Sequence, residues 1–353
     1  MPTGNDYRYV VIGAGAIGGC LGGVLARAGV RVVLVARGRN AEALAADGLT
    51  LRTPDGTFRA PIQTVSSPED LRLTDRDVLV FATKTQQLDA ALEQWVDHPV
   101  HLPDGTVTTA GERLPVLTAL NGVVAEEKAL RYFARVFGVC VWCPAVHLDP
   151  GEVIVRSWPV VGQFHIARWP ASIHTAADGE FLAELAATWT AAGIGVRTPG
   201  DVAPWKYNKL LMNLGNAIDA LARRDADVGQ VVGAAIAEGS DVLRRAGIDF
   251  VPFETSDAVR SDGPHPRPVP GFEDAPNNST SQSLSRNTGN VETDYLNGEI
   301  VRLAHRHGIA APVNAALTRA ARAASRDGQG TGQYSPEQLA ELVGLDPVAA
   351  QRG

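Results

Sequence analysis

Short apolar runs alternate with helical patterns through the first half of the chain. Runs rich in Val, Leu and Ile occur at residues 9–15, 30–37, 77–84 and 114–122, and each run predicts a strand. Unbroken apolar runs are typical of strands that are covered on both faces. Because helical patterns separate the strands, βαβ units and a parallel sheet are expected. We therefore assign residues 1–199 to an α/β domain.

Beyond about residue 200 the apolar residues recur at helical spacing. Long helical patterns cover residues 204–224, 230–247 and 291–308, which predicts an all-helical second domain over residues 200–325. The third pattern ends with His305, Arg306 and His307 before Gly308. Cationic side chains before a glycine are typical of a helix C-terminus. We therefore assign these histidines to the helix dipole rather than to catalysis.

Two further segments differ in composition. Residues 261–278 are rich in Pro, Gly and Asp, which excludes a helix or a central strand and predicts a long loop. Residues 326–353 contain a flexible linker followed by a short helical pattern. Ser335 is the expected N-cap of that helix and Gln338 completes a capping box, so we predict a peripheral C-terminal helix.

The composition excludes several classes of protein. The 353 residues are 45% hydrophobic and 20% charged, with a formal net charge of -7, which argues against nucleic acid or an anionic membrane as partner. No apolar run is long enough to cross a bilayer, and the N-terminus lacks the pattern of a secretory signal. Three cysteines are too few for a disulfide framework, so the cytoplasm is the expected location.

Cys140 and Cys143 have the C-x-x-C spacing found in redox and zinc sites. They lie in an apolar stretch that predicts a strand ending before Pro144, and the sequence contains no second ligand pair beside them. We interpret them as small packing residues and expect no metal site, with a redox role as the alternative.

A glycine-rich motif follows the first predicted strand. Gly13, Gly15 and Gly18 form G-x-G-x-x-G at the start of a helix, with Ala16 and Ile17 between the last two. In this context the first glycine allows a tight turn, the second admits a pyrophosphate, and the third lets helix and strand pack closely. The helix N-terminus then faces the anion with free N–H groups. These five residues are predicted to bind a dinucleotide.

The end of the second strand indicates which dinucleotide binds. An acidic residue there usually accepts a hydrogen bond from the ribose 2′-hydroxyl of NAD. Arg37 occupies that place in this chain, with Arg39 close behind. A cation suits a 2′-phosphate, so NADP(H) is predicted rather than NAD(H). The alternative is that Arg37 is simply solvated.

The first predicted helix of the second domain carries an unusual polar stripe. Lys209, Asn213 and Asn216 are spaced i, i+4 and i+7, which places them on one side of a regular helix at about 100° per residue. Leu210 and Leu214 fall on an adjacent stripe and are expected in the core. The stripe is predicted to face a site, and the alternative is an ordinary wet helix face.

Taken in order, these residues resemble the ketopantoate reductase (2-dehydropantoate 2-reductase) family. The resemblance extends from Tyr9 to about Ser325 and includes "GAGAIGG", "VARGRN", "ATKTQQ", "LNGV", "WKYNKLLMN" and "VETDYLNGEIVRLAHRHGIAAPVN". It implies a Rossmann domain followed by a helical domain like the C-terminal domain of 6-phosphogluconate dehydrogenase. It also implies reduction of 2-dehydropantoate, a small 2-oxo acid, to (R)-pantoate by NADPH, on the way to pantothenate and coenzyme A.

The same resemblance assigns residues to the cofactor side of the site. Lys84 is similar to the family lysine near the cofactor, and Gln87 matches a glutamine of the same loop. Asn121 is similar to the asparagine at the sheet edge, near both nicotinamide and substrate.

On the substrate side, the resemblance makes Lys209 the catalytic lysine, with Asn213 one turn later. Ser279 is the best match for the serine that holds the substrate carboxylate, and Glu292 for the glutamate that contacts the substrate hydroxyl. Reduction of a ketone needs a hydride on carbon and a proton on oxygen. A lysine ammonium can stabilise the developing alkoxide and then donate that proton.

Three features depart from the family pattern. The second family asparagine is expected eight residues after the lysine, where this chain has Ala217, so the place of Asn216 stays open between a helix irregularity and a rebuilt site. Residues 95–114 and 261–278 are longer than a compact member needs, and both could border the active-site cleft. An altered substrate is therefore an alternative.

Three functions are weighed. The first is NADPH-dependent reduction of 2-dehydropantoate, and the second is reduction of another branched 2-oxo acid by a paralogue. The third is a regulator that binds NADP(H) without turnover, which the set of Lys209, Asn213 and Glu292 argues against. The oligomeric state stays open, with a homodimer as one option.

Overall fold

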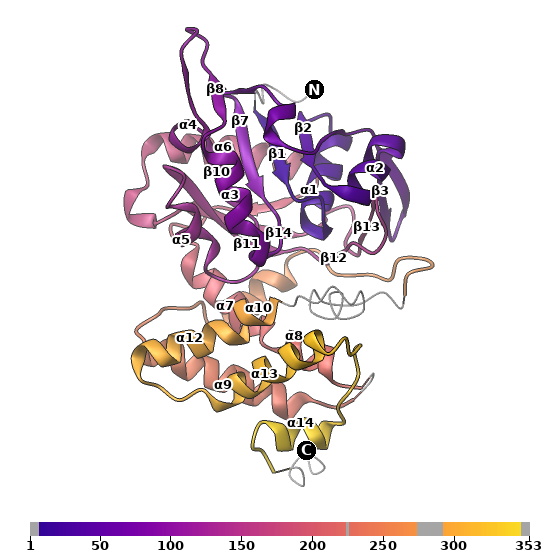
Figure 1. The fold of residues 1–353 in the computed structure, drawn as a ribbon, viewed down its shortest axis with the longest axis vertical. Helices are drawn as coiled ribbons and strands as arrows, with labels where there is room; N and C mark the ends of the chain where they lie inside the picture. Colours follow the sequence, from indigo (N-terminus) through magenta and orange to yellow (C-terminus); the bar gives the residue numbers. More distant parts are fainter. Residues whose placement is uncertain (1–6, 224–225, 274–291, 347–353) are drawn as a thin grey trace. The chain divides into compact units, whose positions relative to one another are not determined.

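A computed structural model describes residues 7–223, 226–273 and 292–346, and the chain divides into two compact units. The first unit comprises residues 1–120, 124–202 and 254–275, and the second comprises 121–123, 203–253 and 276–353. The strands belong to the first unit, whereas the second consists of helices and loops in its described part (Figure 1).

An eight-stranded sheet forms the centre of the first unit, in the order β15-β14-β11-β10-β7-β1-β2-β5. The strands are β1 (Arg8–Ile12), β2 (Val32–Val35), β5 (Gln63–Val65), β7 (Asp77–Phe81), β10 (Pro115–Thr118), β11 (Arg135–Trp142), β14 (Gln163–Arg168) and β15 (Gly195–Arg197). All four predicted strands are present. The sheet is mixed rather than wholly parallel, because β14 turns back and pairs antiparallel with β11.

Helices cover both faces of this sheet, which confirms the α/β prediction. Tyr9 and Val11 of β1 belong to one core together with α1 (Ala16–Arg27) and α6 (Ala176–Ala191). Val10 and Ile12 of the same strand belong to a second core together with α3 (Leu88–Val96) and α5 (Ala125–Ala129). Alternate side chains of a strand point to opposite faces, so a continuous apolar run fills both cores.

Residues 95–114 form a β-hairpin at the amino end of the central strands. Its strands β8 (Pro99–His101) and β9 (Val107–Thr109) pair with each other, β8 also pairs with β6 (Leu73–Thr74), and α4 (Ala110–Arg113) follows. The backbone N–H of Thr74 donates to the carboxylate of Asp77, the first residue of β7, at 2.7 Å. The hairpin projects from the unit in Figure 1. The hairpin lies at the amino end of β7, whereas the glycine-rich loop follows the carboxyl end of β1, and the expectation that residues 95–114 could border the active-site cleft stays a prediction.

The Pro-rich segment is held against a second sheet of the first unit. That sheet contains β12 (Ala145–Val146), β13 (Glu152–Val155), β3 (Leu49–Thr53) and β4 (Gly56–Ala60). After α10 (Phe253–Ser261), residues 262–273 form no helix or strand, as predicted. The backbone N–H of Arg267 donates to the carbonyl of Arg156 at 2.7 Å, and Val269 packs on Val146 and Ile154. Residues 274–278 of this segment lie outside the described residues.

The described part of the second unit is helical, as predicted. It contains α7 (Ala203–Asn213), α8 (Gly215–Leu221), α9 (Gly229–Arg245), α12 (Asn297–His307), α13 (Pro312–Arg326) and α14 (Pro336–Leu342), around one apolar core. The helix predicted from residue 291 begins only at Asn297, because residues 292–295 form a 3-10 turn and Leu296 (φ -115, ψ -92) is not helical. Gly308 ends α12 in the left-handed conformation, and the Ser335 cap with Gln338 is also confirmed.

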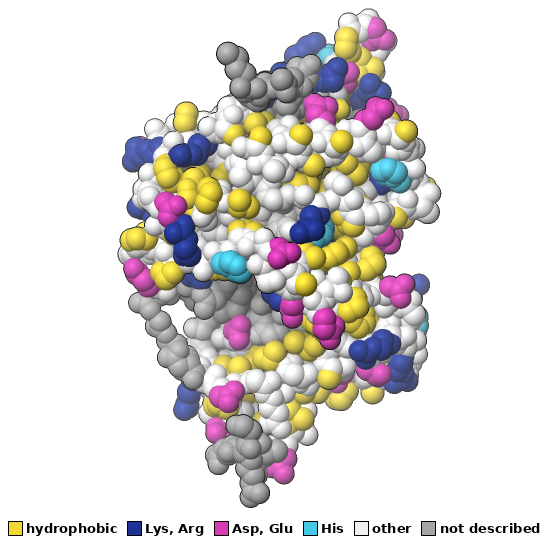
Figure 2. All heavy atoms as spheres, turned by 180° about the vertical axis from the view of Figure 1, so that it is seen from behind, with side chains coloured by type: hydrophobic (Ala, Val, Ile, Leu, Met, Phe, Trp, Pro, Cys, Tyr) yellow, Lys and Arg dark blue, Asp and Glu magenta, His cyan; other side chains and the backbone are white. Residues whose placement is uncertain are grey.

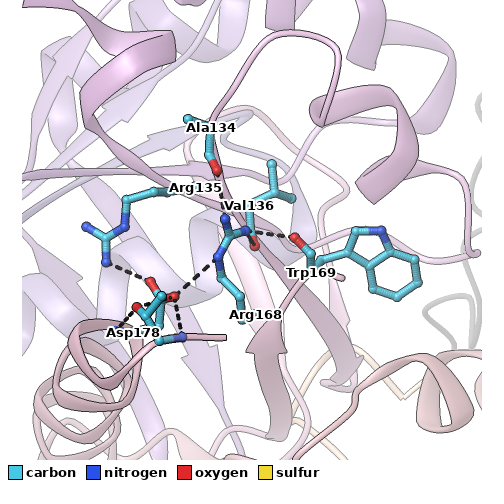
Figure 3. A network of polar contacts seen from close by, with 7 residues as sticks. Ala134, Arg135, Val136, Arg168, Trp169 and Asp178 are labelled. Carbon is cyan, nitrogen blue, oxygen red and sulfur yellow. Dashed lines mark hydrogen bonds and ion pairs between the residues drawn. The ribbon is translucent and has the colours of Figure 1, made fainter. Parts of the chain in front are cut away.

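A buried carboxylate joins the edge of the central sheet to α6. Asp178 accepts hydrogen bonds from the Thr175 hydroxyl at 2.8 Å and the Thr175 N–H at 3.1 Å. The same carboxylate pairs with Arg135 at 3.0 Å and with Arg168 Nε at 3.4 Å (Figure 3). Burial by itself would raise the pKa of Asp178, but the hydrogen bonds from Thr175 and the pairing with Arg135 outweigh it and lower that pKa.

Replacing Asp178 with asparagine is expected to lower the free energy of unfolding by about 2 kcal/mol, because Arg168 stays buried without its counter-ion. Since the folded-state pKa of Asp178 is lowered, its contribution is present above the unfolded-state value of about 4 and is lost as the pH falls below it. Urea unfolding at pH 7 and pH 3 measures both effects. The exposed pair of Asp55 with Arg267 is the control, and Asp55→Asn should cost less than about 0.5 kcal/mol.

Candidate functional site

Each glycine of the motif has its own structural reason. Gly13 has φ +104, and a β-carbon there would lie 2.9 Å from the backbone of Ala82 and Thr83, just after β7. A β-carbon on Gly18 would lie 2.0 Å from the carbonyl oxygen of Gly13. At Gly15 a β-carbon would meet no atom of the described chain within 4 Å. The loop is therefore packed at its first and third glycines and open at its second, where a ligand could approach the backbone.

The N-terminus of α1 adds donors to this open position. Gly15 is the N-cap of α1, no side chain caps the helix, and its first turn contains no acidic residue. Ala16 and Ile17 are partly exposed there. Free N–H groups at a helix N-terminus together with the helix dipole favour an anion such as a phosphate group.

Asn40, in α2 (Gly38–Asp47), fixes the position of the glycine-rich loop. Its amide nitrogen donates to the carbonyl of Ala14 at 2.9 Å, while its amide oxygen accepts the N–H of Gly151 at 2.8 Å. The sequence interpretation did not single out Asn40. The sequence feature that could have identified Asn40 is its position three residues after Arg37, at the start of the helix that follows β2.

The structure places Arg37 at the expected end of β2. It is exposed, it is the N-cap residue of α2, and its guanidinium donates to the side-chain oxygen of Gln94 in α3. Neither Arg37 nor the exposed Arg39 pairs with a carboxylate among the residues that the structure describes. A cation that is not neutralised nearby can attract a 2′-phosphate.

Lys84 and Gln87 form one short loop after β7. The Lys84 N–H donates to the side-chain oxygen of Gln87 at 3.4 Å, and the Gln87 N–H donates to the carbonyl of Lys84 at 2.9 Å. Both side chains are exposed. Gln87 therefore stabilises the loop that carries Lys84, in addition to any contact that it makes with a cofactor.

In the second unit, the segment of Asn121 adjoins the turn of Glu292. Asn121 is partly exposed, and its neighbour Gly122 has φ +81. A β-carbon on Gly122 would lie 3.0 Å from the carbonyl oxygen of Tyr295, which ends the 3-10 turn that begins at Glu292. Glu292 is only 6% exposed. Two predicted site residues thus lie on adjoining segments, whereas Ser279 lies outside the described residues.

The helix with Lys209 is interrupted in the middle of its polar stripe. α7 ends at Asn213, α8 begins at Gly215, and the Leu214 N–H bonds to the carbonyl of Leu211 at 3.2 Å. A hydrogen bond that spans three residues instead of four is typical of a 3-10 turn. The regular helix assumed for the stripe of Lys209, Asn213 and Asn216 is thus interrupted at Leu214, although Leu214 keeps helical angles (φ -62, ψ -27), and the placement of Asn216 on the same side stays a prediction. Of the two alternatives left open, the local irregularity is present.

The polar residues of α7 and α8 differ in burial. Lys209 and Asn216 are partly exposed, whereas Asn213 is 7% exposed and its amide nitrogen has no acceptor among the described residues. A buried donor without a partner is uncommon and often marks a functional site. Lys206 and Asn208 are also buried, at 3% and 0% exposure, and the sequence interpretation did not single them out.

Cys143 of the C-x-x-C pair contacts Cys20 of α1, with their sulfur atoms 3.6 Å apart. All three cysteines are free, and no group of His, Cys, Asp and Glu able to hold a metal ion occurs among the described residues.

No helix in the described ranges is long and apolar enough to span a membrane. Lys and Arg alternate with Asp and Glu on the face shown in Figure 2.

Comparison with known proteins gives consistent matches over most of the chain. The family model described as "Ketopantoate reductase PanE/ApbA" matches residues 9–170, and its C-terminal counterpart matches residues 201–325. A 2-dehydropantoate 2-reductase of Caulobacter vibrioides is 30% identical over 89% of this chain and 98% of its own length. One of Pyrococcus horikoshii is 27% identical over 87% and 94%.

Solved structures give the same result. A PanE/ApbA family ketopantoate reductase from Ralstonia eutropha has a TM-score of 0.71 at 26% identity, covering 91% of this chain and 99% of that one. A D-mandelate dehydrogenase bound to NADH and anilino(oxo)acetate has a TM-score of 0.72 at 19% identity, with the same coverage, which shows a common fold.

Proposed function

This chain belongs to the ketopantoate reductase family and is an oxidoreductase, and we propose that it reduces 2-dehydropantoate to (R)-pantoate with NADPH. The observation that carries the proposal is Asn213, a buried amide donor without a described acceptor, one helical turn after Lys209. A 2-oxo acid offers the carbonyl and carboxylate oxygens that such donors need. The free cysteines agree with a reducing cytoplasm, which we propose as its location.

The cofactor would be held by the first unit. The open backbone at Gly15 and the N-terminus of α1 would bind the pyrophosphate, and Arg37 the 2′-phosphate. Lys84, in the loop after β7, would contribute a further positive charge. When bound, NADPH supplies the hydride.

The second unit would bind the substrate and supply the proton. Lys209 as an ammonium ion would stabilise the negative charge that develops on the ketone oxygen and would donate a proton from Nζ. Asn213 would orient the substrate through its amide nitrogen, because an amide donates without changing its charge. Asn121 would lie near the substrate, as would Asn216 and Ser279, and Glu292 would accept a hydrogen bond from the substrate hydroxyl.

Replacing Arg37 with alanine is expected to weaken NADPH binding about tenfold, because a charge-assisted contact with the 2′-phosphate is lost. NADH lacks this phosphate, so its affinity should stay within about twofold. Fluorescence titration with both cofactors measures the change in preference. Gln94→Ala is the control, since it removes the described partner of Arg37 but keeps the cation. An unchanged NADPH preference in Arg37→Ala would contradict the assignment.

The alternative is a paralogous reductase of another branched 2-oxo acid. Identities of 23 to 30% over most of the chain with relatives named 2-dehydropantoate 2-reductase leave room for a changed substrate. A panel assay that follows NADPH absorbance with 2-dehydropantoate and related 2-oxo acids tests both. The highest kcat/KM on another acid would favour the alternative. NADPH binding without turnover of any acid would favour a regulator.

A further inference from the structure

A buried side-chain network reaches the interruption between α7 and α8. The amide nitrogen of Asn297 donates to the carbonyl of Leu214 at 3.1 Å and to the side-chain oxygen of Asn314 at 3.0 Å. Both asparagines are 0% exposed. Asn297 therefore uses both of its amide hydrogens. One of these two hydrogen bonds holds Leu214, the residue between α7 and α8.

The orientation of Asn314 is fixed from its other side. Its amide nitrogen donates to the carbonyl of Ala235 at 3.1 Å and to Glu238 at 2.9 Å. Glu238 also accepts the backbone N–H groups of Val313 and Asn314, at 2.9 and 2.8 Å, in the first turn of α13. Because both amide hydrogens of Asn314 are engaged, its oxygen must face Asn297. The chain Glu238–Asn314–Asn297 thus runs from α9 through α13 and α12 to α7.

The network acts at the point where the helix departs from regular geometry. Gly215 follows Leu214 directly, and interruptions of this kind occur where a glycine or an inserted side chain disturbs the helical hydrogen bonds. The Asn297 amide contacts the chain at this point, through the Leu214 carbonyl. The direction in which the Asn213 side chain points depends on how α7 ends. The position of Lys209 along the helix axis, one turn earlier, depends on it as well.

We propose that Asn297, oriented by Asn314 and Glu238, is a positioning residue that holds the end of α7 so that Lys209 and Asn213 are set for proton delivery. Asn297 touches neither substrate nor cofactor in this scheme. It acts through the Leu214 carbonyl. The proposal rests on the proposed function, because it assigns the geometry of the same proton donor.

Asn297→Asp is the sharpest test, because it keeps the shape of the side chain and removes both amide donors. The variant should lose about tenfold to 100-fold in kcat for the 2-oxo acid, with the dissociation constant of NADPH within about twofold.

The pH dependence of the variant is a second test. Burial raises the pKa of a carboxyl group, and a protonated carboxyl group can donate a single hydrogen bond. The ratio of variant to wild-type kcat should therefore rise as the pH falls from 8 to about 5. Hydrogen exchange of residues 214–218 should become faster.

Thr318→Val is the matched control. It removes a buried hydrogen bond, from the Thr318 hydroxyl to the Asn314 carbonyl at 2.7 Å, without touching the link to Leu214. Its kcat and the exchange of residues 214–218 should match those of the wild type. If Asn297→Asp keeps the kcat of Thr318→Val, or leaves exchange at 214–218 unchanged, the proposal is overturned. A wild-type protein that reduces no 2-oxo acid would overturn the proposed function itself, and the positioning role of Asn297 with it.

Discussion

Lys209→Met is expected to lower kcat for the 2-oxo acid about 1,000-fold, because loss of a general acid typically costs 10²- to 10⁴-fold. Methionine keeps the length and the apolar stem of lysine but can neither stabilise an alkoxide nor donate a proton. The NADPH dissociation constant should stay within about twofold, since Gly15, Arg37 and Lys84, which are assigned to the phosphates of the cofactor, belong to the first unit. Steady-state kinetics with saturating NADPH and a fluorescence titration measure the two quantities.

Two other lysines serve as controls for this experiment. Lys128 pairs with Asp89 in the first unit, so Lys128→Met should leave kcat unchanged. Lys206 is 3% exposed and lies one turn before Leu210 on α7. Lys206→Met is expected to lower the free energy of unfolding more than Lys209→Met does. If Lys206→Met abolished turnover in a folded protein while Lys209→Met kept it, the assignment of Lys209 as proton donor would be wrong.

The sequence was sufficient wherever a local pattern determines the structure. The G-x-G-x-x-G motif fixes its loop because Gly13 needs a positive φ and Gly18 has no room for a β-carbon. The central strands followed from apolar runs that fill cores on both faces of the sheet. The end of α12 followed from Gly308, which adopts the left-handed conformation.

Features set by contacts distant in the sequence were missed. The stripe of Lys209, Asn213 and Asn216 assumed one continuous helix, but the residue that holds the interruption, Asn297, is 83 positions away from Leu214. The antiparallel pairing of β14 with β11 is likewise a tertiary contact. One signal was available: an asparagine beside a glycine, as in Asn297–Gly298, is unfavourable inside a helix and indicated that α12 begins there.

Gly15→Ala is expected to raise the NADPH dissociation constant at least about 100-fold, which corresponds to about 2.7 kcal/mol. The new methyl group would occupy the space through which a pyrophosphate approaches the backbone. It meets no atom of the described chain within 4 Å, and φ at Gly15 is -84, which alanine adopts readily. The free energy of unfolding without cofactor should therefore be unchanged or higher by about 0.5 kcal/mol. Urea unfolding and fluorescence titration separate the two effects.

Gly18→Ala is the counterpart, because its methyl group would lie 2.0 Å from a backbone oxygen of the chain itself. This variant should lose about 3 kcal/mol of unfolding free energy before any ligand is added. The pair separates two reasons for a glycine: Gly18 serves packing within the protein, whereas Gly15 would serve the ligand. If Gly15→Ala bound NADPH like the wild type, the pyrophosphate would not lie at the N-terminus of α1. If Gly15→Ala were instead as unstable as Gly18→Ala, its glycine would be explained by the fold alone, and the open position would be no evidence for a cofactor.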